Sequence, residues 1–209
     1  MSPLFIALLG VMLVPLLVAT WRTSLWGLAF QGLLMAWLAY RMQPHPTTPS
    51  QWLTLADLAV LRGIAAPYAL HRVLRARKVP ARHDLIPPNL LSWTFAFGSV
   101  LVASNFAQAL VPAPETEQNV VAVAVAGIML GFLVLATRST MFSQMMGALR
   151  IENAIAFFEL GGEHHAQLVA VQLGQMLVFV GTIVLYRWYL GSVDEACASL
   201  GDDVSEVTL

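Results

Sequence analysis

The chain has 209 residues, of which 58% are hydrophobic and only 11% are charged, and its formal net charge is −1. A soluble domain carries roughly 25% charged residues, so the composition indicates an integral membrane protein and argues against nucleic acid as a partner. The single cysteine, Cys197, excludes an intramolecular disulfide and any zinc or iron–sulfur site built from several cysteines of this chain.

Seven segments have the length and apolar character of membrane-spanning helices, which need ~20 residues each. Prolines break the chain after the second segment and on both sides of the fourth, and a tight turn over 21–24 joins the first two. We therefore predict an all-α, polytopic helical bundle, with one transmembrane domain over 1–191 and an acidic tail over 192–209 that is either solvated or a short surface helix. The predicted spans are 3–20, 25–41, 53–72, 90–111, 119–137, 141–160 and 166–190.

Basic residues predict how the bundle is oriented, because they are enriched in cytoplasmic loops. With seven spans, nearly all of them fall on one side, and the opposite side carries glutamates. The N-terminus is then outside and the C-terminus is cytoplasmic. The basic residues on the cytoplasmic side are Arg22, Arg72, Arg75, Arg77, Lys78, Arg82, Arg138 and Arg187.

The sixth span carries charges at bilayer depth: Arg150, Glu152 and Glu159, together with Asn153. Each such charge costs at least ~2.5–3.5 kcal/mol if it faces lipid, so these side chains are expected to face protein, paired charge or internal water. Glu152 and Glu159 are seven residues apart and share one helix face, whereas Arg150 points away from it.

The third span carries Asp57 and Arg62. It runs antiparallel to the sixth, which places Arg62 at the depth of Glu152. Asp57 lies ~7.5 Å further outward, and Glu159 lies ~10.5 Å outward of Glu152. Arg62 is therefore the predicted partner of Glu152. The two acids of the sixth span and Asp57 are either a proton or ion relay tuned by Arg62, or Arg62 and Glu152 are an ion pair that fixes helix registry.

Other polar side chains in the spans predict hydrogen bonds between helices and a possible extension of this network. They are Gln31, Asn105, Gln108, Gln172 and Gln175, in addition to Arg150 and Asn153.

The histidines do not predict a metal centre. His71 and His83 are expected on the inner side and His164 and His165 on the outer side, so no pair faces another across the bilayer for a haem. Glu163–His165 is interpreted as a polar turn. The sequence has no nucleophile motif and no phosphate-binding loop, so the chain is expected to be noncatalytic on its own.

Two stretches resemble the hydrogenase-4 component E family, as do the length and the seven spans. One is 61–70, LRGIAAPYAL, in which a basic residue precedes a proline by five positions and a basic loop follows. The other is 137–159, where Arg138 precedes a helix with an Ile151-Glu152-Asn153 motif. The family is similar over this second region to the K-type membrane subunit of respiratory complex I. Arg62 stands where the family usually has lysine, and Gln172 and Gln175 stand where some relatives have an acid.

The resemblance implies a membrane subunit of an energy-converting nickel–iron hydrogenase, of the formate hydrogenlyase type, in the bacterial cytoplasmic membrane. Such a complex couples electron transfer to proton or sodium movement. Its partners would be antiporter-like membrane subunits and a soluble hydrogenase-like module, which would hold the nickel and iron–sulfur centres, and no cofactor is expected in this chain. Glu152 would be the central relay residue, with Glu159 and Asp57 on its outer side. The alternatives are a subunit of a multisubunit cation/proton antiporter and a purely structural scaffold.

Overall fold

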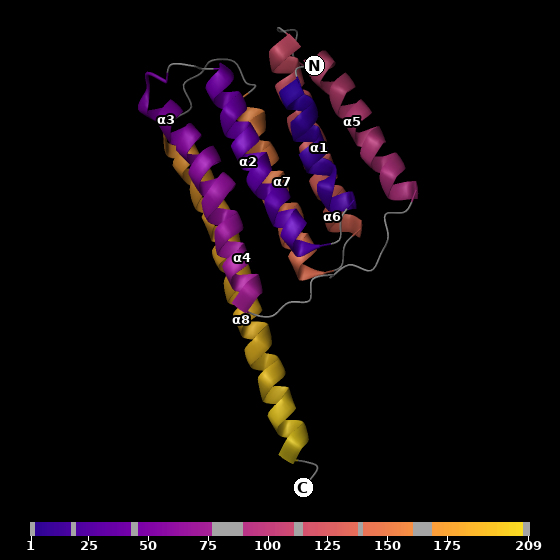
Figure 1. Ribbon diagram of the computed structural model, residues 1–209, viewed down its shortest axis with the longest axis vertical. Coiled ribbons are helices and arrows are strands. Elements are labelled where there is room, and N and C mark those ends of the chain that lie inside the picture. Colours follow the sequence, from indigo (N-terminus) through magenta and orange to yellow (C-terminus); the bar gives the residue numbers. More distant parts are fainter. Residues whose placement is uncertain are drawn as a thin grey trace.

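The computed structural model describes residues 3–17, 20–42, 46–76, 90–110, 115–137, 140–160 and 169–206, and these residues are organised as helices (Figure 1). The all-α prediction is confirmed. Three consecutive elements, α3, η1 and α4, form one continuous rod, so the described residues build seven helical rods. The elements are α1 (Pro3–Leu17), α2 (Trp21–Met42), α3 (Pro49–Ala56), η1 (Asp57–Ala65), α4 (Ala66–Ala76), α5 (Leu90–Leu110), α6 (Glu115–Thr137), α7 (Met141–Leu160) and α8 (Val169–Glu206).

Three of the rods are long and apolar enough to cross a membrane: Pro49–Arg75, Glu115–Thr137 and Val169–Tyr189. The outer surface of the bundle is also apolar, and α8 is the clearest case, with Leu177 73% and Trp188 68% exposed. A soluble protein rarely leaves such a surface open to water. The chain therefore has the character of a membrane protein.

Each predicted span contains a helix, but two boundaries differ from the predictions. The turn predicted over 21–24 is wrong, because α2 already begins at Trp21. Thr20 lies directly before the helix and its carbonyl accepts from the backbone N–H of Ser24 and the hydroxyl of Thr23, so this threonine, rather than a turn, prepares the first helical residues.

The second difference is at the C-terminal end, where α8 does not stop near residue 190 but continues to Glu206. In Figure 1 this extension projects well beyond the other helices. The segment from 191 to 206 has no proline and is rich in residues that tolerate a helix, including alanine, leucine and glutamate. The predicted tail is therefore helical as far as the structure describes it.

Helix packing leaves a polar layer between two apolar clusters. One cluster joins α1, α2, η1, α6 and α7 through residues such as Leu58 and Phe157. The other joins α2, α4, α7 and α8 through residues such as Leu149 and Phe179. On α7, Asn153 lies one turn from both Leu149 and Phe157, so the polar groups described below sit between the two clusters.

The middle of the third rod, η1, is wound as a π-helix, in which each N–H bonds to the carbonyl five residues earlier. The N–H of Ala66 donates to the carbonyl of Leu61, which is that spacing. Pro67 follows directly and has no N–H with which to restore the α-helical bond to Gly63. Gly63 lies against Gly32 of α2 so closely that a Cβ on Gly32 would come within 2.6 Å of the Gly63 nitrogen. The two glycines therefore fix η1 against α2.

Candidate functional site: a buried polar layer between η1, α7 and α8

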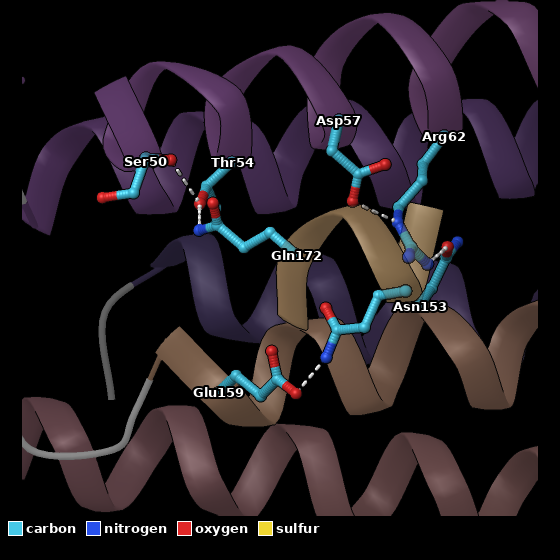
Figure 2. A network of polar contacts seen from close by, with 8 residues as sticks. Ser50, Thr54, Asp57, Arg62, Asn153, Glu159 and Gln172 are labelled. Atoms are coloured by element: carbon cyan, nitrogen blue, oxygen red, sulfur yellow. Dashed lines mark hydrogen bonds and ion pairs between the residues drawn. The ribbon is translucent and has the colours of Figure 1, made fainter. Parts of the chain in front are cut away.

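Arg62 is the centre of the polar layer, although it is only 1% exposed. Its Nε donates to Asp57 Oδ2 at 2.8 Å, and its Nη1 donates to Asn153 Oδ1 at 3.0 Å. The guanidinium carbon also lies 4.3 Å from the ring centroid of Phe179, within the range of a cation–π interaction. One buried cation therefore ties η1 to both α7 and α8 (Figure 2).

The π winding explains why Asp57 and Arg62 meet. Residues five apart in an α-helix are ~1.4 turns apart and point ~140° away from each other. In a π-helix, hydrogen bonds join residues five apart, so five residues make about one turn. The winding of η1 thus brings both side chains onto the face that looks toward α7 and α8, and Figure 2 shows them side by side.

This pairing corrects one prediction. Arg62 was expected to pair directly with Glu152, but within the described part of the chain its ion pair is made with Asp57. Glu152 instead accepts a hydrogen bond from the hydroxyl of Thr182 at 2.6 Å. The α-helical spacing assumed for the third span had turned Asp57 away from Arg62 and left Glu152 as the nearest acid.

Two contacts between α7 and α8 have the same antiparallel register. Glu152 bonds to Thr182, and Glu159 accepts from the amide of Gln175. The acids are seven residues apart on α7, and their partners are seven residues apart on α8. Glu152 and Glu159 therefore share one face, as predicted from their spacing, and that face looks at α8.

The predicted match of charges in depth is also found, because each pair lines one cavity. Arg62 and Glu152 line a cavity of about 300 Å³ whose walls are largely apolar. Asp57 and Glu159 line a second cavity of about 10 Å³ with Thr54, Gln172 and Gln175 among its walls. The four charged residues thus occupy two adjacent levels of the same seam.

The seam continues to the N-terminal end of the third rod. The amide of Gln172 donates to the hydroxyl of Thr54, which in turn donates to the carbonyl of Ser50 at 3.0 Å. In Figure 2, Ser50, Thr54, Asp57 and Arg62 follow one another along the rod, all on the side that faces α7 and α8. Polar groups therefore line this side of the rod over about four helical turns.

Arg150 lies in a different place. It is 3% exposed and its Nη1 donates to the backbone carbonyls of Val11 at 3.2 Å and Met12 at 3.1 Å in α1. The Val11 carbonyl is available because Pro15, four residues later, has no N–H to donate to it. Arg150 points away from the Glu152 face, as predicted, and joins α7 to α1 rather than extending the seam.

The other predicted members of the network divide clearly. Asn105 is exposed and donates to the carbonyl of Leu101 in its own helix at 2.9 Å, and Gln108 is exposed as well. Both lie on α5, away from the seam. Gln31 is fully buried in α2, next to Gly32.

Of the histidines, His71 lies against the ring of Trp21, with centroids 5.5 Å apart. His83, Glu163, His164 and His165 lie outside the described residues. Within the ranges that the structure describes, no three histidine, cysteine, aspartate or glutamate side chains gather as a metal site would require.

Sequence reasoning missed Thr54, Phe179 and Thr182. A signal was present for the α8 residues, because 172, 175, 179 and 182 follow the spacing of three and four residues that marks one helix face. Phe179 interrupts the polar pattern of this face, but its ring is the one that Arg62 contacts.

No family model, curated protein or solved structure matches the chain.

Proposed function

We propose that the chain is a noncatalytic membrane subunit that moves protons or other monovalent cations through the buried carboxylates of the η1–α7–α8 seam. One observation carries the proposal: Arg62 is the one basic side chain at the seam among the described residues, and it faces three acids, Asp57, Glu152 and Glu159. With all four ionised, the charge at the seam would be −2. A membrane interior is unfavourable for such an excess, so the acids favour a cation in transit.

An ion pair that only fixes helix registry accounts for less of the geometry. Asp57 and Arg62 already neutralise each other at 2.8 Å, and Glu152 and Glu159 would then be two additional buried acids with neutral hydrogen-bond donors. Intramembrane acids with neutral partners are characteristic of proton and ion relays. The arrangement therefore favours transport over a scaffold role.

The membrane setting of the proposal follows from the resemblance to hydrogenase-4 component E. All seven rods would cross the bacterial cytoplasmic membrane, with the N-terminus outside and the C-terminus in the cytoplasm. The chain would be one membrane-arm subunit of an energy-converting hydrogenase, next to antiporter-like subunits. Nickel and iron–sulfur centres would belong to the soluble module of that complex.

Glu152→Gln tests the transport role, since it keeps the size of the side chain and removes its charge. In inverted membrane vesicles that contain the intact complex, electron-transfer-driven acidification measured with a fluorescent ΔpH probe should fall at least tenfold, while the complex still assembles. Glu117→Gln is the matched control, because Glu117 lies in the first turn of α6, outside the seam. Unchanged acidification in assembled Glu152→Gln complexes would leave a scaffold as the better explanation.

The nature of the complex requires a separate experiment. Purification of the chain in mild detergent should recover hydrogenase large and small subunits together with antiporter-like subunits. Recovery of antiporter-like subunits without any redox protein would instead identify a cation/proton antiporter, for which the same seam would serve.

A further inference from the structure

The smaller cavity of the seam has the size and lining of a binding site. Its volume is about 10 Å³, and a single water molecule needs roughly 10–15 Å³. Two carboxylates, Asp57 and Glu159, line it together with the side chains of Thr54, Gln172 and Gln175. A water molecule in a protein interior typically needs two to four polar partners, and this cavity offers more than that.

An independent observation points to a guest. Asp57 is 7% exposed, and while its Oδ2 accepts from Arg62, its Oδ1 is buried without any hydrogen-bond partner. A buried acceptor left unsatisfied costs roughly 1–3 kcal/mol, and more when it is charged. Because Asp57 lines the cavity, the unsatisfied oxygen and the space for a donor or cation occur together.

We propose that this cavity binds one water-sized guest, either a water molecule or a dehydrated sodium ion, between Asp57 and Glu159. Carboxylate, hydroxyl and amide oxygens are the ligands that hard cations prefer, and the same oxygens accept hydrogen bonds from water. The volume excludes a hydrated ion. The guest connects an acid of the third rod to an acid of α7, so an ion can pass between helices at this level and need not travel along α7 from Glu152. Its transport role rests on the proposed function, whereas its occupancy does not.

Two substitutions remove the site in different ways. Ala156 is 8% exposed and lines the cavity, so Ala156→Val adds two methyl groups where the guest would lie. Thr54→Val keeps the shape of the side chain but removes its hydroxyl. Ala148→Val is the control, because it adds the same two methyl groups to α7 at a residue that lines neither cavity.

Sodium binding is measured on the purified full chain as the thermal unfolding midpoint in sodium chloride against choline chloride. At ten times its dissociation constant, sodium should raise the midpoint by about 3 °C in the wild type and in Ala148→Val. It should have no effect in Ala156→Val or Thr54→Val. This result would identify sodium as the guest.

Water is measured by infrared spectroscopy, as an O–H band that shifts when H₂¹⁸O replaces H₂O. A band that is present in the wild type and Ala148→Val, lost in Ala156→Val and altered in Glu159→Gln would identify water. The proposal is overturned if the wild type shows neither signal, or if either signal persists in Ala156→Val. None of these measurements depends on pumping, so vesicle data that contradict the proposed function would leave the occupancy result standing, and the reverse also holds.

Discussion

Removing one partner of the Asp57–Arg62 pair should destabilise the chain far more than removing both. The pair is buried, with Arg62 1% and Asp57 7% exposed, and its N···O distance is 2.8 Å. Loss of one partner from a buried pair leaves an uncompensated charge and costs about 3–5 kcal/mol. We expect this cost for both Asp57→Asn and Arg62→Met.

The double variant should recover most of that loss. With both charges gone, the main remaining defect is the amide oxygen of Asn153, which loses its donor, and an unsatisfied buried group costs about 1–3 kcal/mol. The double variant should therefore be destabilised by about 1–3 kcal/mol. Since the single losses would add up to about 6–10 kcal/mol, the coupling energy should be at least ~3 kcal/mol.

The free energy of unfolding can be measured by titrating the full chain from mild detergent into sodium dodecyl sulfate, with circular dichroism as the signal. Gln172→Leu serves as a control, because it removes a neutral hydrogen bond of the same seam and should cost only about 1 kcal/mol. Losses that are additive within ~0.5 kcal/mol would show that the two side chains do not interact, and the central contact of the seam would then be wrong.

Two further predictions use the same titration. Gly32→Ala should cost at least ~2 kcal/mol, because its Cβ would lie 2.6 Å from the backbone of Gly63, whereas Gly98→Ala, with open space around it, should be neutral or slightly stabilising; equal effects would contradict the close approach of α2 and η1. Arg150→Met should cost at least ~1 kcal/mol less in a Pro15→Ala background, since alanine supplies the N–H that the carbonyl beside Arg150 lacks, and an unchanged cost would argue against that contact.

Those features of the fold that depend on length and periodicity could be predicted from the sequence. Apolar segments of about 20 residues predict the rods, and the seven-residue spacing of Glu152 and Glu159 predicts their common face. Counting residues inward from the ends of two antiparallel spans also placed Arg62 level with Glu152 and Asp57 level with Glu159. These three inferences need only a straight helix of regular pitch, and α7 is one.

Contacts that depend on close packing between distant segments could not be predicted in this way. Arg150 bonds to α1 because Pro15 leaves a carbonyl without its donor, and residues 15 and 150 have no periodic relation in the sequence. The direct partner of Arg62 was missed for a similar reason, since a regular α-helix would hold Asp57 on another face.

The π winding of η1 also bears on why the seam exists. A π-helical segment is rare, usually a single turn, and is frequently found at functional sites. Apolar packing of η1 on α2 needs only Gly32 and Gly63, and a helix that accommodates Pro67 needs only a local adjustment. Neither requires Asp57 and Arg62 to meet over nine π-helical residues. The winding is accounted for if it holds a charged pair against the two acids of α7, and that is the arrangement an ion path through the seam would need.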